Sequence, residues 1–171
     1  GNLSGVTYRA KMDSDWTMEF ISSGCQKLTG YSDADFYSNT ITWNNLMVEE
    51  DRARIWLKVE EAIAQKEYFE VEYRLTNRNG QTLWLWEKGC GVYNEHGQLL
   101  ALEGFITDIT DRIIAEQEQL KLLSVLDNSF NEIYIFNAES FKFEYANKSA
   151  LDNIGYSIDE LKDLMPTDIA P

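Results

Sequence analysis

The segment 69–108 alternates between apolar and polar side chains, and this period limits the fold more than any other feature of the chain. Over its first seven residues every second side chain is aromatic or aliphatic, which is typical of a strand with one buried face. The dipeptide Asn79-Gly80 follows and favours a tight hairpin, because it tolerates positive φ. Further strands are expected over 82–93 and 99–107, so the segment predicts an antiparallel meander of three strands.

The second of these strands is apolar on both faces. Leu83 and Leu85 point to one side of the sheet, while Trp84 and Trp86 point to the other. A helix of the same chain or a partner subunit is expected to cover the outer face, and simple surface aromatics are the alternative. Trp84 and Trp86 are therefore predicted interface residues.

A longer helix is predicted before the meander, over residues 51–66. Ile55, Val59 and Ile63 recur at every fourth residue and form an apolar stripe, as expected of an amphipathic helix. Asp51 is expected to cap the free amides of the first turn. The stripe indicates a helix with one face on the core.

The order of the elements predicts the fold class. Two short strands, over 7–12 and 16–21, and small helical turns over 24–37 precede the longer helix. Strands at both ends of the segment thus enclose helices in its middle. This arrangement predicts an α+β domain with one antiparallel sheet and the helices on one face of it.

The pattern changes again after Asp108. Ile113, Leu120 and Leu123 lie at spacings of seven and three, which predicts an amphipathic connector helix over 111–126. Two heptads are too few to establish a coiled coil, but these three residues are candidates for an interface between helices.

The opening of the chain recurs after this helix at a constant offset of 125 residues. The triplet Gly-Tyr-Ser at residues 30–32 is repeated at residues 155–157. A repeat of this period indicates a duplicated domain rather than a solenoid. The chain is therefore predicted to hold one domain over residues 3–110, then the connector, then the N-terminal part of a second, truncated domain over residues 127–171.

The charge balance limits the partners. Asp and Glu number 29 against 15 Lys and Arg, which gives a net charge of −14. Nucleic acid and anionic membrane surfaces demand clustered cations, so both are disfavoured as partners. No apolar run approaches the roughly 18 residues of a membrane helix, and no signal peptide is apparent. We expect a cytoplasmic module, whose full-length protein could be membrane-anchored elsewhere.

Catalytic and metal-binding patterns are sparse. The single histidine, His96, lies in a predicted hairpin turn, which leaves little for a catalytic triad or a histidine-rich metal site. Cys25 and Cys90 lack the spacing of a zinc or redox motif. There is no glycine-rich phosphate loop. The sequence therefore predicts no catalytic residue, no metal site and no enzymatic activity in this stretch of chain.

The end of the meander carries the most specific motif. It reads Gly104-Phe-Ile-Thr-Asp-Ile-Thr-Asp-Arg112 and fits Gly-x-x-x-Asp-Ile-Thr-x-Arg. Together with the strand and hairpin before it, this motif resembles the PAS domain with its PAC motif. The resemblance covers residues 6–112, and residues 127–171 resemble the first half of another PAS domain.

This resemblance implies a five-stranded antiparallel sheet that cups a cavity under the long helix. Such domains sense a small molecule, light, redox state or a partner in bacterial signalling proteins. Their output comes from a histidine kinase, a diguanylate cyclase or a chemoreceptor module further along. The cavity is expected to be lined by Ile55, Val59, Ile63, Val71, Tyr73 and Leu85. An ordinary packed core is the alternative interpretation of these residues.

The resemblance also gives a role to the junction between the last strand and the connector helix. In the family an Asp and the following Thr and Arg anchor this junction, and these are Asp108, Thr110 and Arg112 here. A shift of the sheet can reach the helix only through these residues and Ile109. An ordinary helix cap by Asp108 or Thr110 is the structural alternative, and both can hold together.

Two cofactors of the family lack their residues. Haem-binding PAS domains commonly use a His on the long helix, and residues 51–66 contain none. Photoactive flavin domains need a reactive Cys, and residues 37–50 contain none. The prediction is thus a sensor of an unidentified small ligand that forms a homodimer. The alternative is a ligand-free module that dimerises and spaces output domains.

Overall fold

The computed structural model describes residues 5–169 and divides into two compact units after Ile113. The outermost residues of the two predicted domains, 3–4 and 170–171, lie outside the described part of the chain. The division falls near the start of the helix that the sequence predicts as a connector.

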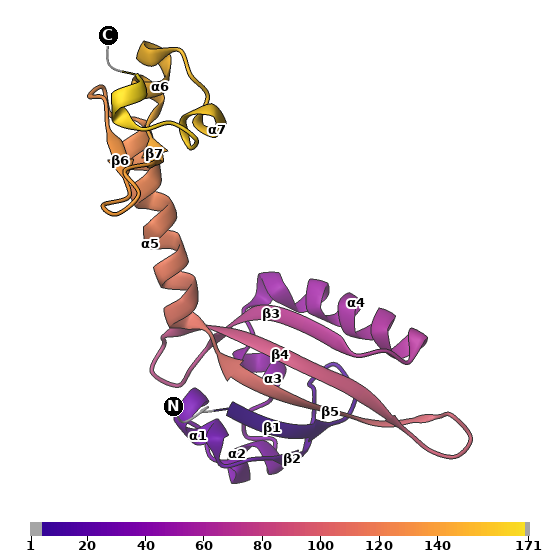
Figure 1. The fold of residues 1–171 in the computed structure, drawn as a ribbon. Coiled ribbons are helices and arrows are strands. Elements are labelled where there is room, and N and C mark those ends of the chain that lie inside the picture. The colour runs from indigo at the N-terminus through magenta and orange to yellow at the C-terminus, as the bar shows by residue number, and fades with distance from the viewer. Residues whose placement is uncertain (1–4, 170–171) are drawn as a thin grey trace. The chain divides into compact units, whose positions relative to one another are not determined.

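One antiparallel sheet of five strands forms the framework of the first unit (Figure 1). The strands are β1 (Gly5–Ala10), β2 (Met18–Ile21), β3 (Phe69–Thr76), β4 (Thr82–Tyr93) and β5 (Leu99–Asp108). Their order across the sheet is β2-β1-β5-β4-β3. The predicted α+β class and the meander of β3, β4 and β5 are confirmed.

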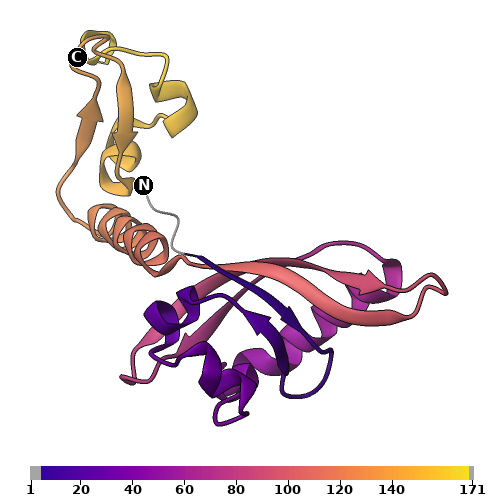
Figure 2. The same ribbon diagram turned by 90° about the horizontal axis from the view of Figure 1, so that it is seen from below.

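Four helices lie on the same side of this sheet (Figure 2). They are α1 (Gly24–Thr29), α2 (Asp33–Tyr37), α3 (Trp43–Leu46) and α4 (Glu49–Gln65). Ile55 and Val59 of α4 are buried in one hydrophobic cluster with Tyr73 and Leu85 of the sheet. The core of the first unit therefore lies between the helices and the inner face of the sheet.

The prediction that Asp51 caps the long helix is wrong. The helix α4 begins two residues earlier, at Glu49, and Val48 occupies the N-cap position without a side-chain hydrogen bond. The carboxylate of Asp51 instead accepts hydrogen bonds from the backbone N–H of Arg74 (2.8 Å) and from its Nε (3.0 Å) and Nη2 (3.0 Å). The carboxylate of Asp51 thus bonds three donors of Arg74 instead of the free amides of the helix, and these bonds connect α4 to β3.

The first two strands are also shorter or shifted relative to prediction. β1 covers residues 5–10 instead of 7–12, and β2 begins at Met18 instead of Trp16. Trp16 has a φ of 51°, a left-handed conformation that no strand residue adopts. Asp13 Oδ1 accepts the backbone N–H groups of Asp15 and Thr17, so the link between the strands is a turn built on Asp13.

The second unit contains a two-stranded sheet and three short helical elements. Its elements are β6 (Tyr134–Phe136), β7 (Phe143–Ala146), α6 (Lys148–Ile154), α7 (Ile158–Leu161) and the 3-10 helix η1 (Pro166–Asp168). The helix α5 (Thr110–Asp127) begins at the end of β5, and most of its length belongs to this unit.

The two units repeat the same local structures at the offset of 125 residues. Strand β7 begins 125 residues after β2, and α7 begins 125 residues after α2. Gly30 and Gly155 both end a helix with positive φ, 81° and 73°, a conformation that glycine adopts without strain. Ser32 and Ser157 then both form capping boxes at the next helix. The shared triplet Gly-Tyr-Ser thus sets the same helix end and helix start twice.

Candidate functional site

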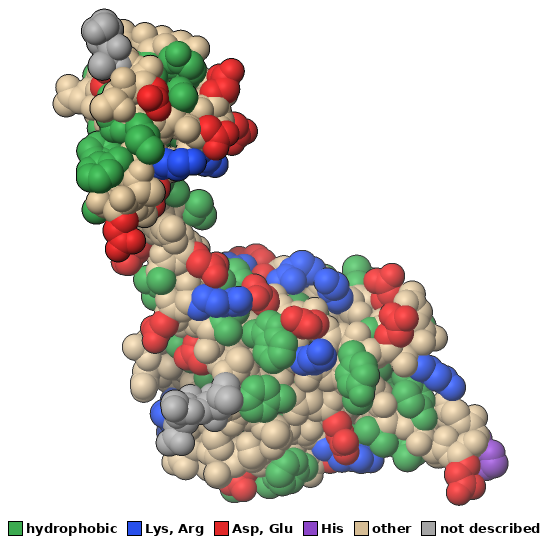
Figure 3. Space-filling model, in the orientation of Figure 1, with side chains coloured by type: hydrophobic (Ala, Val, Ile, Leu, Met, Phe, Trp, Pro, Cys, Tyr) green, Lys and Arg blue, Asp and Glu red, His purple; other side chains and the backbone are tan. Residues whose placement is uncertain are grey.

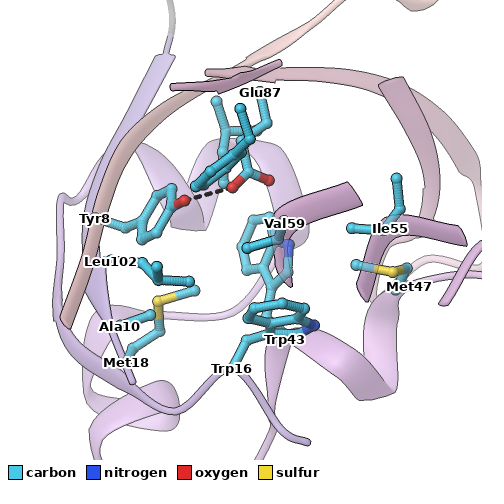
Figure 4. A pocket seen from close by; sticks show the side chains of 12 residues that line it. Tyr8, Ala10, Trp16, Met18, Trp43, Met47, Ile55, Val59, Glu87 and Leu102 are labelled. Carbon is cyan, nitrogen blue, oxygen red and sulfur yellow. Dashed lines mark hydrogen bonds between the residues drawn. The ribbon is translucent and has the colours of Figure 1, made fainter. Parts of the chain in front are cut away.

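A small cavity lies in the first unit between the inner face of the sheet and the helices (Figure 4). Its volume is about 20 Å³, which is room for about one water molecule. Most of its lining is apolar, and its polar side is formed by Tyr8 of β1 and Glu87 of β4. The volume and the lining define a nearly filled cavity with one carboxylate in it.

The predicted cavity residues divide into two groups. Ile55 and Val59 line the cavity. Ile63 is partly buried and packs against the core cluster, while Val71 and Leu85 are buried in that cluster away from the cavity. Tyr73 is also buried there, and its hydroxyl reaches the cavity's carboxylate.

Glu87 is the centre of a buried hydrogen-bond network. It follows Leu85 by two residues on β4, so the strand places both side chains on the buried face. The hydroxyl of Tyr8 donates to Oε1 of Glu87, and the hydroxyl of Tyr73 donates to Oε2 at 2.6 Å. Nε1 of Trp43 donates to the hydroxyl of Tyr73 at 2.8 Å. Strands β1 and β3 therefore meet at one carboxylate of β4, and helix α3 joins the network through Tyr73.

The surroundings shift the acid–base behaviour of this network. Burial raises the pKa of Glu87, because it disfavours the charged form, while the hydrogen bonds from Tyr73 and Tyr8 act in the opposite direction. Burial and the nearby charge of Glu87 hold the pKa of Tyr8 and of Tyr73 well above the usual range of tyrosine. Both tyrosines therefore stay protonated and remain donors.

The sequence reasoning missed Glu87, Tyr8, Trp16 and Trp43 as residues of this site. A signal for Glu87 was present, since it is an acidic residue at an inward position of an alternating strand. Trp16 and Trp43 carry no such signal, because Trp16 lies in the turn before β2 and Trp43 is the first residue of the short helix α3, and both reach the cavity only through the tertiary fold.

The junction between β5 and α5 is fastened to two neighbouring strands. The hydroxyl of Thr110 accepts the backbone N–H of Trp84 at 2.9 Å and donates to Oδ1 of Asp108 at 2.5 Å. The backbone N–H of Ile109 donates to the carbonyl of Trp84 at 2.8 Å. Nη2 of Arg112 contacts Oε1 of Glu72 on β3 at 2.6 Å. The start of α5 is thus connected to both β4 and β3.

The predicted interface residues are all at least partly exposed. The guanidinium of Arg74 lies 5.7 Å from the centre of a Trp84 ring, and Nε1 of Trp86 donates to Oε1 of Glu70 at 2.8 Å. Ile113 is partly buried, and Leu120 and Leu123 are exposed on α5. Side chains of the neighbouring strand β3 therefore contact both indoles, and α5 has no buried residue.

Other predicted features lie away from the cavity. The backbone N–H of His96 donates to Oδ1 of Asn94 within the turn between β4 and β5. Cys25 is buried in α1 and Cys90 is partly exposed on β4. Within residues 5–169, no group of three or more His, Cys, Asp and Glu side chains is placed to hold a metal ion. None of the helices described combines the length and hydropathy that a membrane crossing requires.

Family models match both units of the chain. The model described as PAS fold matches residues 18–106, and the model described as PAS domain matches residues 131–170. The two matches fall in the units before and after the division at Ile113.

Curated relatives include much longer sensor proteins. The methyl sulfide methyltransferase-associated sensor of Methanosarcina acetivorans is 28% identical over 126 residues, which are 71% of this chain and 12% of that protein. The blue-light-activated histidine kinase of Brucella ovis is 32% identical over 108 residues, which are 59% of this chain and 21% of that protein. The chain therefore spans only a small part of the length of these relatives.

Solved structures share the fold. The sensory box histidine kinase/response regulator of Burkholderia thailandensis has a TM-score of 0.59 and 23% identity, covering 72% of this chain and 91% of that chain. The N-terminal domain of the diguanylate cyclase with PAS/PAC sensor of Marinobacter aquaeolei has a TM-score of 0.54 and 20% identity, covering 63% and 97%.

Proposed function

The chain belongs to the PAS family, and from this membership we propose that its first unit is the input module of a longer signalling protein. Similarity to a histidine kinase and to the sensor domain of a diguanylate cyclase supports a sensory role in bacterial signalling. Sensor domains of this family are generally not catalytic. We therefore place the output activity in another domain, and we place this module in the cytoplasm.

The junction at Thr110 is the observation that carries the proposal. Its hydroxyl bridges the backbone of Trp84 and the carboxylate of Asp108, so α5 cannot turn or slide at its first residue without breaking a bond to the sheet. Arg112 adds a second connection, to Glu72. A displacement of β3 or β4 relative to β5 would therefore change the angle or position of α5. This is the relay proposed for Asp108, Ile109, Thr110 and Arg112.

The relay is tested in the full-length protein with the substitution Asp108→Ala. The measurement is the ratio of highest to lowest output activity over the conditions to which the wild-type protein responds. The substitution removes the acceptor that orients the Thr110 hydroxyl, and we expect the ratio to fall towards one. Asp111→Ala is the matched control, since Asp111 is an exposed aspartate one residue after Thr110. A full response in a folded Asp108→Ala variant would refute the relay.

The cavity beside Glu87 is the proposed place of input. It touches β1, β4 and α4 at once, so a molecule that enters it must move at least one of them, because the present volume holds only about one water molecule. Met18 and Met47 line the cavity, and methionine side chains adapt readily to a change of volume. Ile55 and Val59 are the predicted lining residues that such a molecule would contact.

A ligand-free dimerisation module remains the second proposal, and it is favoured by the apolar surface of α5. Leu120, Leu122 and Val125 are 67%, 59% and 61% exposed, and hydrophobic side chains on α5 are visible in Figure 3. Burial of such residues between two copies would stabilise a homodimer. Analytical ultracentrifugation of the wild-type chain and of Leu120→Asp would test this. A monomer at all concentrations would exclude a dimer built on these residues.

A further inference from the structure

A carboxylate and two indole rings lie on opposite sides of the cavity. Figure 4 shows Tyr8 and Glu87 at the upper side and Trp16 and Trp43 at the lower side. All four side chains are at least nine-tenths buried. The cavity therefore combines one acidic group with two indole rings and little room for solvent.

The hydrogen bonds at Glu87 suit a carboxylate that acts as an acceptor. The N–H of Trp43 donates to the hydroxyl of Tyr73, so that hydroxyl uses its own hydrogen for Oε2 of Glu87. The hydroxyl of Tyr8 donates to Oε1. Each oxygen of Glu87 thus lies beside a tyrosine hydroxyl, an arrangement that suits an ionised carboxylate. Each oxygen keeps a further lone pair, since a carboxylate accepts up to about four hydrogen bonds.

Within residues 5–169, no cationic side chain balances a charge on Glu87. None of the described residues that line the cavity is Lys, Arg or His, and the ion pairs of residues 5–169 do not include Glu87. A buried charge without a counter-ion is costly. The raised pKa of Glu87 reflects that cost, and a bound cation would lower this pKa, because it favours the charged form.

The two indoles provide the other half of a site for an organic cation. Indole faces attract cations, and the attraction is strongest where water is excluded. Trp16 is held by a tilted contact with Trp56, with 5.2 Å between ring centres. Its φ of 51° is rare for a bulky residue, and such conformations persist where the surroundings fix them. The contact with Trp56 therefore supports the ring of Trp16 beside the cavity.

We propose that this cavity binds a small alkylammonium ion, from methylammonium to trimethylammonium in size, between Glu87 and the indoles of Trp16 and Trp43. The charge faces the carboxylate and the rings, and the methyl groups face the apolar lining that includes Met18 and Met47. The inference rests on the proposed sensory function, because it names the ligand class of the same cavity. The methylated ions exceed the present volume, so the methionine side chains move aside when they bind.

The first experiment is a titration of the 171-residue chain with methylammonium, dimethylammonium and trimethylammonium chloride. Isothermal titration gives the affinity, and tryptophan fluorescence gives the thermal midpoint of the first unit, which holds all five tryptophans. Sodium chloride at equal ionic strength and neutral tert-butanol are the controls. We expect saturable binding and a raised midpoint with at least one cation and with neither control. No saturable effect of any cation would overturn the proposal.

Two substitutions at the cavity are expected to weaken cation binding to different extents. Glu87→Gln removes the charge at nearly constant shape and should weaken cation binding about tenfold or more, as for other hydrogen bonds to charged groups. Tyr8→Phe removes one donor but keeps the carboxylate itself, and it should weaken binding less than Glu87→Gln does. Glu61→Gln removes a charge from an exposed position of α4 and should leave binding unchanged. Equal weakening by Glu87→Gln and Tyr8→Phe would indicate general loosening of the core and overturn the proposal.

The outcomes separate the ligand class from the relay. Where Glu87→Gln does not fold, the cation series on the wild-type chain and on Tyr8→Phe decides the question. Loss of regulation in Asp108→Ala without any cation binding would leave the relay and reject the alkylammonium ligand. Cation binding in a protein whose regulation survives Asp108→Ala would support the alkylammonium ligand and reject the relay.

Discussion

The hydroxyl of Tyr73 donates a 2.6 Å hydrogen bond to Oε2 of Glu87. The same hydroxyl accepts the indole N–H of Trp43 at 2.8 Å, so it serves a donor and an acceptor at once. Tyr73 is fully buried, and no water can replace it without entering the core. The hydroxyl oxygen of Tyr73 therefore links the indole of Trp43 to one of the two carboxylate oxygens of Glu87.

Tyr73→Phe should destabilise the first unit by about 1–3 kcal/mol, because it leaves a buried carboxylate oxygen and a buried indole N–H without a partner. The ring itself is retained, so no large cavity forms. Urea unfolding followed by tryptophan fluorescence measures this change in the first unit. Tyr68→Phe removes a hydroxyl from a side chain that is 72% exposed and should change the unfolding free energy by less than about 0.5 kcal/mol. Equal effects would contradict the role of the buried hydroxyl.

The buried position of Glu87 predicts a pH dependence of stability. Burial raises its pKa in the folded state above the value of about 4.3 for an exposed glutamate. The stability that Glu87 contributes is therefore fully present below its pKa in the unfolded state, and it is lost as the pH rises through its pKa in the folded state. Relative to Glu87→Gln, the wild-type chain should become less stable from about pH 4 upwards, and the difference should level off above the folded pKa.

Unfolding free energies of the two proteins between pH 4 and pH 8 check this sign. The comparison uses only how the difference in unfolding free energy between wild type and Glu87→Gln varies with pH. A pH-independent effect of the glutamine amide on stability therefore cancels. Glu61→Gln, at an exposed helix position, should give a difference that does not vary with pH. A difference between wild type and Glu87→Gln that is flat, or that favours the wild type as pH rises, would disprove the assignment.

Local patterns were sufficient for the sheet and its turns. The alternation over 69–75 predicted β3, because a period of two places one face of a strand on the core. Asn79-Gly80 predicted the turn, and Gly80 indeed has a φ of 77°. Such features depend on neighbours in sequence, so they are readable without the tertiary structure.

Structural features that depend on a residue distant in sequence could not be predicted from the sequence. Asp51 resembles a helix cap in sequence. In the structure its carboxylate instead accepts hydrogen bonds from Arg74, which lies opposite it on β3. Val71 and Leu85 share the inward face with Glu87, but the position of the cavity is set by Trp16 and other residues from outside the meander. Periodicity gives the face of a strand and does not say where along that face the packing leaves space.

Asp51→Asn should destabilise the first unit by about 1–3 kcal/mol at pH 7, since it removes a charged acceptor shared by three donors of Arg74. The side chain of Asp51 is only 10% exposed, so water replaces these bonds poorly. The hydrogen bond from the side chain of Arg74 is the main cause that lowers the pKa of Asp51. Its stabilisation is therefore present above the unfolded pKa of about 3.9 and is lost as the pH falls through the lower folded pKa.

Urea unfolding at pH 7 and at pH 3 distinguishes this effect from a general loss of packing. The difference between wild type and Asp51→Asn should shrink at the lower pH. Glu60→Gln, at an exposed position of α4, is the control and should have little effect at either pH. A difference that stays the same at both values would show that the charge of Asp51 is not its source.

Asn147 should have the corresponding role in the second unit. It is fully buried; Oδ1 accepts the backbone N–H groups of Ile133 (2.9 Å) and Ala150 (3.1 Å). Nδ2 donates to the carbonyls of Leu126 (3.0 Å) and Asn131 (2.9 Å). One amide thus joins the end of α5, the approach to β6 and the start of α6. Asn147→Ala leaves these groups without partners and should destabilise the second unit by at least about 1–3 kcal/mol.

Hydrogen exchange at the amides of Ile133 and Ala150 measures this loss directly, because both donate to the side chain that is removed. We expect exchange at these amides to accelerate by about tenfold or more, as a loss of 1.4 kcal/mol implies. Tryptophan fluorescence reports only on the first unit and should be unchanged, which separates a local effect from unfolding of the whole chain. Asn153→Ala removes an exposed amide whose side-chain hydrogen bond within residues 5–169 goes to Glu132, and it should leave both exchange rates unaltered. Exchange at Ile133 and Ala150 that is as slow in Asn147→Ala as in the wild type would show that Asn147 does not hold these segments together.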